Sequence, residues 1–246
     1  MSTGEAFVAD LIFSISRALE NVGIQANNPI SEMQMDRSIA FWDRIAKGYA
    51  DDPIADEESY RVKLEKTAEA LGSDARILEI GGGTGTTAVR LSPHLGEILC
   101  TEPSQQMIEI ARRRAEEAGA NNIRFLQASV DDLVEGDLLQ AEGPFDAVLA
   151  FNVLHVLKNP QAAIEGASAA IKPGGALITS TMFMSAPFKA FAPLVWIGKA
   201  IGKLPNVAFI SDTKFVQWQT TAGLEMEYRW KPKGFKATYT LARKRS

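Results

Sequence analysis

Short apolar runs alternate with helix-length amphipathic segments from residue 75 onward. This alternation constrains the fold more than any other feature, because it is typical of βα units that build a parallel sheet. We predict strands at about 76–81, 97–102, 122–127, 145–151, 175–181, 224–230 and 235–242. Helices are predicted near 85–92, 104–118, 130–139, 160–171, 187–203 and 213–222. The predicted fold class is therefore α/β, with a mostly parallel sheet and helices on both of its faces.

The first 72 residues have a different, helical pattern. Apolar residues recur at three- and four-residue steps from Phe7 to Val22, which predicts an amphipathic helix over 5–22. Two further helices are predicted over 36–49 and 57–71. We therefore expect an N-terminal helical annex or lid at 1–72 and one main domain at 73–246.

The composition limits the function classes. A formal net charge of -4 argues against a broad basic face for nucleic acid. Cys100 is the single cysteine, and the two histidines lie far apart in sequence, so no disulfide framework and no metal site is expected. The N-terminus lacks a secretory signal, and three lysines and two prolines interrupt the apolar stretch 182–204. We expect a cytoplasmic protein without a transmembrane helix.

A glycine-rich turn follows the first predicted strand. Gly81, Gly82, Gly83 and Gly85 allow the backbone to approach a ligand closely and to adopt conformations that a Cβ disfavours. The stretch from Gly83 to Ala88 also fits the dinucleotide fingerprint, with an acidic Glu102 roughly 20 residues further on. The turn therefore predicts a nucleoside cofactor without choosing between NAD and S-adenosylmethionine.

Two carboxylates flank this turn. Glu79, just before the first glycine, would attract a cationic amine or sulfonium and repel a pyrophosphate, which favours S-adenosylmethionine. An alternative role for Glu79 is to bind a backbone amide in the turn. Glu102 ends the second predicted strand, where a carboxylate can accept both hydroxyls of a ribose in either cofactor.

Four sequence blocks occur in a characteristic order. They are Glu79–Gly85, Cys100–Ser104 with Met107 following, Phe145–His155, and Lys172–Gly175. With these blocks the chain resembles the class I S-adenosylmethionine-dependent methyltransferases, in particular the group with the ubiquinone and menaquinone C-methyltransferases. The resemblance runs from about Phe41 to Gly175, and it implies a Rossmann-like fold with a seven-stranded sheet, an antiparallel last strand and S-adenosylmethionine as cofactor.

The resemblance also implies a cofactor site. The glycines would line the methionine and ribose part, Glu102 would bind the ribose, Met107 would pack on the adenine, and Phe151 and Asn152 would border the transferred methyl group. The full set of expected cofactor residues is Glu79, Gly81, Gly82, Gly83, Gly85, Glu102, Pro103, Met107, Ser129, Val130, Phe151, Asn152 and Tyr49.

Two of these residues have open alternatives. Ser129 stands where many relatives have an aspartate that binds the adenine amine, and a neutral hydroxyl is a weaker acceptor than a carboxylate. Tyr49 could cover the sulfonium with its ring, which attracts cations, or it could simply pack within the annex.

Methyl transfer from a sulfonium needs positioning more than acid–base catalysis. His155, after the fourth predicted strand, is the candidate general base, and a structural bond to loop backbone is the alternative. The apolar stretch 182–204 suggests a small, aromatic or lipid-like acceptor. Its lysines could rest on a membrane surface, whereas a core-covering helix or a homodimer contact would also explain it.

Two other functions remain open from the sequence. One is an NAD(P)-dependent oxidoreductase, supported by the fingerprint from Gly83 to Ala88 and opposed by Glu79. The other is a non-catalytic protein that binds S-adenosylmethionine as a sensor or scaffold.

Overall fold

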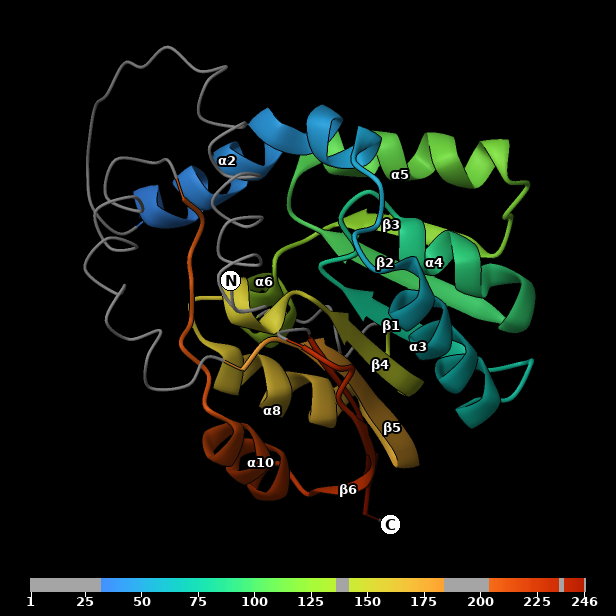
Figure 1. Cartoon of the computed structure of the whole chain (residues 1–246), viewed down its shortest axis with the longest axis vertical. Coiled ribbons are helices and arrows are strands. Elements are labelled where there is room, and N and C mark those ends of the chain that lie inside the picture. The colour runs from blue at the N-terminus through green and yellow to red at the C-terminus, as the bar shows by residue number, and fades with distance from the viewer. Residues whose placement is uncertain (1–31, 136–141, 184–203, 235–236, 246) are drawn as a thin grey trace.

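The computed structural model describes residues 32–135, 142–183, 204–234 and 237–245. Its centre is a seven-stranded sheet with the order β3-β2-β1-β4-β5-β7-β6 (Figure 1). The strands are β1 (Arg76–Ile80), β2 (Glu97–Glu102), β3 (Ile123–Gln127), β4 (Phe145–Phe151), β5 (Ile171–Thr181), β6 (Leu224–Trp230) and β7 (Thr238–Lys244). Only β7 runs antiparallel to its neighbours β5 and β6. The predicted mostly parallel sheet with an antiparallel last strand is confirmed.

Helices cover both faces of this sheet. They are α2 (Glu32–Asp51), α3 (Glu57–Ala70), α4 (Thr86–Leu91), α5 (Gln105–Glu117), α6 (Val130–Glu135), α8 (Pro160–Ala170) and α10 (Asp212–Thr221), with the short 3-10 turns η1 (Ser92–His94) and η2 (Leu154–Val156). Side-chain oxygens cap the N-termini of several helices. The Ser104 hydroxyl accepts from the Met107 amide of α5 at 3.2 Å, and the Asn159 side-chain oxygen accepts from the Ala162 amide of α8 at 3.1 Å. The predicted helices 5–22 and 187–203 lie outside the described residues.

The boundaries of β5 and β7 differ from the prediction because pairing decides them, and β7 begins at Thr238 rather than 235. β5 begins at Ile171 rather than 175, since Ile171 pairs with Phe145 before the register shifts to the pair Ala147 and Ala176. β7 ends at Lys244 rather than 242, since its residues pair with β6 as far as Leu224.

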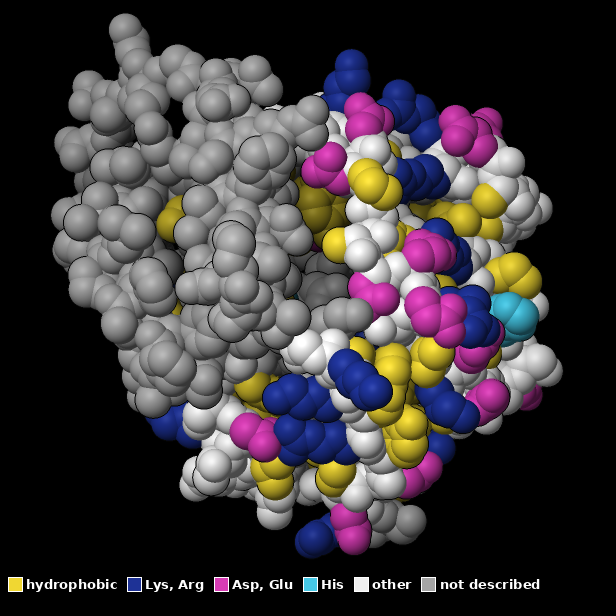
Figure 2. Space-filling model, viewed as in Figure 1, with side chains coloured by type: hydrophobic (Ala, Val, Ile, Leu, Met, Phe, Trp, Pro, Cys, Tyr) yellow, Lys and Arg dark blue, Asp and Glu magenta, His cyan; other side chains and the backbone are white. Residues whose placement is uncertain are grey.

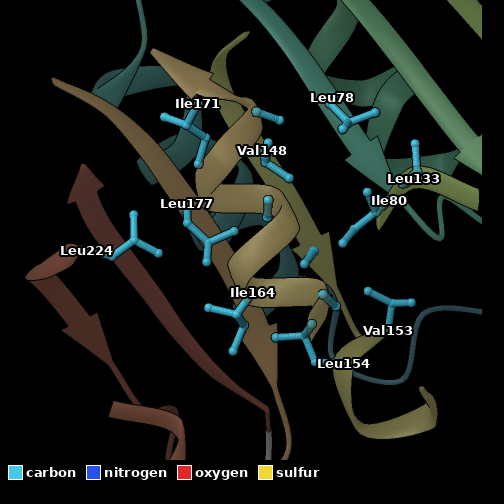
Figure 3. Packing of buried hydrophobic residues seen from close by; sticks show 14 of the residues in the cluster. Leu78, Ile80, Leu133, Val148, Val153, Leu154, Ile164, Ile171, Leu177 and Leu224 are labelled. Carbon is cyan, nitrogen blue, oxygen red and sulfur yellow. The ribbon is translucent and has the colours of Figure 1, made fainter. Parts of the chain in front are cut away.

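The side chains of β4 contribute to two hydrophobic cores, one on each face of the sheet. Val148 and Ala150 point into the core under α8 and α10, where Ile164 and Phe215 are fully buried (Figure 3). Ala147 and Leu149 point to the other side, into the core under α3 and α4. Because the strand is buried on both faces, nearly all of its residues are apolar, and this gave the strong strand pattern in the sequence.

The two described N-terminal helices pack on the sheet domain at different places. α3 covers the sheet face with Tyr60, Leu64 and Ala68. α2 lies beside α5 (Figure 1), where the Asp43 carboxylate accepts hydrogen bonds from the Ser104 hydroxyl at 2.6 Å and the Gln106 amide at 3.1 Å. No helix in the described part of the chain is long and apolar enough to cross a membrane.

Candidate cofactor and acceptor site

A cavity of about 160 Å³ opens at the carboxyl edge of β1, β2 and β4. This edge is where ligands bind in open α/β sheets. The described lining consists of Ser38, Ile39, Trp42, Tyr49, Gly81, Gly83, Glu102, Pro103, Met107, Ala128, Ser129, Val130, Asp131, Phe151, Asn152, Val153, Val156, Leu157, Lys158, Asn159 and Asn206. The structure thus brings most of the predicted site residues together. The predicted residues outside this lining are Glu79, Gly82, Gly85 and His155.

The glycines of the turn serve two purposes. Gly83 has a positive φ of 54°, and a Cβ there would meet only the Met107 sulfur at 3.7 Å, so its backbone faces open cavity space. Gly82 lies against β2 instead, because a Cβ on it would sit 2.1 Å from the Cys100 sulfur. Gly85, with a φ of 77°, begins α4 and lies against Ala111 of α5. Close packing therefore accounts for Gly82 and Gly85.

Glu102 holds the turn and faces the cavity. One carboxylate oxygen accepts from the Gly83 amide and the other from the Ser104 amide, both at 3.0 Å. Burial raises the pKa of Glu102 above its ordinary value, while the Ser104 and Gly83 amides oppose that shift. Each oxygen keeps lone pairs for further donors, so this fixed, poorly hydrated carboxylate suits a pair of ribose hydroxyls.

Glu79 lies beneath the turn rather than in the cavity. It is 2 % exposed, and its carboxyl group interacts with Thr87, Cys100 and the Ala88 amide. Burial raises the pKa of Glu79 to about 8. Its backbone partner is the Ala88 amide of α4 rather than an amide of the glycine turn, and this buried position gives no support to the charge argument for S-adenosylmethionine.

We expect Glu79→Gln to change how stability depends on pH. Folded Glu79 keeps its proton up to about pH 8, whereas the unfolded chain releases it near 4.5, so the wild-type free energy of unfolding falls as the pH rises through this window. A glutamine does not titrate, so the variant should gain ~1–3 kcal/mol relative to wild type between pH 5.5 and 8.5. Urea unfolding across this range measures the difference, with the exposed Glu117→Gln as control. Parallel curves for wild type and Glu79→Gln would contradict the assignment.

The loop after β3 supplies the wall next to Glu102. Ser129 donates its hydroxyl hydrogen to Asp132 at 2.7 Å and accepts from the Asp132 amide at 3.1 Å, which is a capping arrangement at the start of α6. The contact of Ser129 with adenine stays a prediction. Val130 lines the cavity, and so does Asp131, which was not among the predicted site residues.

Residues at the end of β4 form the cavity wall opposite the loop after β3. Phe151 and Asn152 line the cavity, and Asn152 has a positive φ of 57°. His155 follows in η2. It does not line the cavity, whereas its neighbour Val156 does. Burial lowers the pKa of His155 to about 4, and among the described residues its buried Nδ1 has no hydrogen-bond partner. The catalytic role of His155 stays a prediction.

α2 forms the roof of the cavity. Trp42 and Tyr49 line it from above, with their rings edge to face at 6.2 Å. The Arg114 guanidinium joins the roof to the glycine turn, because it donates to the Ala50 carbonyl at 2.5 Å and to the Thr84 and Thr86 hydroxyls at 2.7 and 2.8 Å. Trp42 was missed as a site residue, although its seven-residue spacing from Tyr49 places both on one helix face.

These residues fit a nucleoside cofactor. The open backbone at Gly83, the fixed carboxylate of Glu102 and the buried thioether of Met107 border one end of the cavity. Together they offer close approach, two acceptors for hydroxyls and an apolar surface for a flat base. Among the described residues, no group of three or more His, Cys, Asp or Glu side chains is placed to hold a metal ion.

Comparisons with known proteins agree with this fit. A family model described as a methyltransferase domain matches residues 78–177. The ubiquinone biosynthesis O-methyltransferase of Xanthomonas axonopodis pv. citri is 28% identical over 173 residues, 68% of this chain and 70% of that protein. The uncharacterized methyltransferase YcgJ of Bacillus subtilis is 28% identical over 130 residues, which are 53% of this chain and 49% of that protein.

Solved structures with low sequence identity share the fold. The N-methyltransferase NodS of Bradyrhizobium japonicum, in complex with S-adenosylhomocysteine, superposes with a TM-score of 0.62 at 17% identity, covering 87% of this chain and 98% of NodS. The 1,6-didemethyltoxoflavin-N1-methyltransferase of Burkholderia thailandensis superposes with a TM-score of 0.64 at 15% identity, covering 91% and 94%. The chain carries a methyltransferase domain with the Rossmann-like fold of S-adenosylmethionine-dependent methyltransferases, and these findings support S-adenosylmethionine as its cofactor.

Proposed function

We propose that this chain transfers a methyl group from S-adenosylmethionine to a small, aromatic or lipid-like acceptor. The main support for the proposal is the apolar lining of the cavity beyond the end at Glu102 and Met107. Ile39, Trp42, Val156 and Leu157 give it an apolar wall in the same cavity as Glu102. An apolar body bound there would lie next to Phe151 and Asn152.

We assign the cofactor residues roles that their positions in the cavity support. Glu102 accepts the ribose hydroxyls, Gly81 and Gly83 line the methionine and ribose part, and Met107 packs on the adenine. Bound S-adenosylmethionine supplies a methyl group on a positively charged sulfur. Trp42 and Tyr49 line the roof above it, and Tyr49 presents its ring to the cation. Catalysis on this proposal comes mainly from positioning and desolvation of the two reactants.

His155 remains the candidate base on this proposal, as a weak one. With a pKa of about 4, its imidazole is neutral at pH 7 and able to accept a proton, yet it holds that proton weakly.

The named relatives support a small-molecule acceptor. One is an O-methyltransferase of ubiquinone biosynthesis, and one structural neighbour holds 1,6-didemethyltoxoflavin together with S-adenosylhomocysteine. The tRNA 5-carboxymethoxyuridine methyltransferase of Escherichia coli is 30% identical over 112 residues, only 41% of its length. On the described part of the face shown in Figure 2, Lys and Arg side chains are interspersed with Asp and Glu.

Three further parts of the proposal concern the whole molecule. Residues 1–72 act as a helical annex or lid over the 73–246 domain, which is supported by the position of Trp42 and Tyr49 over the cavity. The stretch 182–204 contacts a membrane or a second copy of the chain; most of it lies outside the described residues. A cytoplasmic location is supported by the single, buried Cys100.

A methyl-transfer assay tests the acceptor class. Purified protein with tritium-labelled S-adenosylmethionine is offered a prenylated catechol, catechol itself, a short polyamine and a tRNA transcript. We expect transfer to the aromatic compounds, and fastest to the prenylated one. Label found only on the polyamine or the tRNA would overturn the proposed acceptor class.

A pair of variants links this activity to the cavity. Trp42→Ala removes apolar surface from the roof and should lower kcat/KM for the aromatic acceptor by about 10-fold or more. Tyr228→Ala removes an aromatic side chain that is 38% exposed on β6, away from the cavity, and should leave kcat/KM within about two-fold. Equal effects of both variants would contradict the placement of the acceptor.

A further inference from the structure

Asn152 is held in an uncommon backbone conformation at the edge of the cavity. Its φ of 57° lies in the left-handed region, which costs a non-glycine residue roughly 1 kcal/mol. Its amide donates to the Ser180 carbonyl of β5 at 2.7 Å, which fixes the turn out of β4. The side chain therefore starts from a fixed position, and only the orientation of its amide group remains to be set.

A buried lysine stands behind this residue. Lys63 of α3 is 7% exposed, and its ammonium group donates to the hydroxyl of the fully buried Ser180 at 2.9 Å. The same hydroxyl lies 3.4 Å from the side-chain oxygen of Asn152 and donates to it. Residues from α3, β5 and the end of β4 thus form one polar chain that leads from the interior to the cavity.

The donors and acceptors in this chain determine its direction. A charged lysine has three N–H donors and no acceptor, so Ser180 must accept from Lys63. The single proton of the Ser180 hydroxyl is then free to point toward Asn152, and it requires an acceptor there. The carbonyl oxygen of Asn152 must therefore face Ser180, and the amide nitrogen with its two N–H donors faces the cavity.

We propose that Lys63 is a positioning residue that acts through Ser180 to turn the Asn152 N–H donors toward the bound molecules. The proposal rests on the proposed function, since it gives the cavity wall at Asn152 a defined polarity.

The polarity of Asn152 defines the chemistry that it recognises. Two N–H donors match an oxygen with free lone pairs on the molecule that borders this edge of the cavity. That oxygen belongs either to the carboxylate of the cofactor's methionine part or to the methyl acceptor. An amine that carries only N–H donors would find no partner at Asn152.

NMR of the side-chain amides tests the proposal directly. The chain has eight asparagines, so selective ¹⁵N-asparagine labelling gives few side-chain NH₂ signals, and Asn152→Asp identifies the pair of Asn152 by its loss. We expect Lys63→Met and Ser180→Ala each to shift this pair by several line widths, and Lys63→Arg to restore it. The Asn159 pair is the matched control, since Asn159 also lines the cavity but its oxygen caps α8.

Ligand addition distinguishes the two sources of the oxygen. A further shift of the Asn152 pair with S-adenosylhomocysteine alone assigns the oxygen to the cofactor. A pair that moves only when catechol is added with S-adenosylhomocysteine assigns it to the methyl acceptor. Both results support donors that face the cavity.

The failures of the two proposals are separable. An Asn152 pair that is unmoved by Ser180→Ala overturns the positioning role, even if Lys63→Met fails to fold. S-adenosylhomocysteine that does not bind the wild type by calorimetry overturns the proposed function, while the amide signals of the ligand-free protein still report on the polar chain.

Discussion

Glu102→Gln is expected to weaken the binding of S-adenosylhomocysteine by about 100-fold or more. On the proposed function, two ribose hydroxyls donate to the buried Glu102 carboxylate in the wild type, and each such bond to a charged group contributes about 1.5–3 kcal/mol. Glutamine offers one carbonyl oxygen and replaces the second acceptor by a donor, which faces either a hydroxyl or the Gly83 or Ser104 amide that Glu102 now binds. Isothermal titration calorimetry measures the loss.

Glu97→Gln is the matched control for this variant. Glu97 begins the same strand β2 at the opposite end, where its carboxylate pairs with Arg76 at 3.0 Å, remote from the cavity. Its replacement should leave the affinity within about two-fold, because partly exposed ion pairs contribute little. An unchanged affinity in folded Glu102→Gln would remove Glu102 from the cofactor site.

Gly85→Ala is expected to destabilise the protein by about 2–5 kcal/mol. The φ of 77° strains an alanine by roughly 1–2 kcal/mol, and its Cβ would lie 2.7 Å from the Ala111 Cβ and 3.1 Å from the Ala111 backbone. Relief of this overlap requires α4 and α5 to separate, and such overpacking typically costs about 1–3 kcal/mol. Thermal unfolding should show a Tm that is about 5–15 °C lower.

Gly119→Ala separates backbone strain from overlap. Gly119 follows α5 with a similar φ of 66°, and nothing lies within 4 Å of a Cβ built there. This variant should cost only about 1 kcal/mol, close to the strain alone. Equal losses at both positions would show that the contact with Ala111 has no energetic weight.

Local sequence patterns were sufficient to predict much of the fold and part of the candidate site. The alternation of apolar runs and amphipathic segments located the strands β1 to β4 within one residue at each end, because burial on both faces of a parallel sheet needs near-continuous apolar runs. Gly83 and Glu102 were found as neighbours because consecutive parallel strands end at the same edge. These features depend on spacing along the chain alone.

Contacts between segments that are distant in sequence could not be predicted from such patterns. Whether Glu79 faced a ligand or the interior depended on how α4 packs over β1, and its burial is visible only in the folded chain. The chain from Lys63 through Ser180 to Asn152 joins residues that are 117 and 28 positions apart.

The sequence by itself therefore determined the order of strands and helices, the glycine turn and the acidic residue that faces it. Only the tertiary structure decided which side chains reach the cavity, how the β5 and β7 boundaries fall, and that α2 brings Trp42 over the site. The physical reason is that periodicity records which face of an element is buried, whereas the partner that buries it is chosen when the elements pack together.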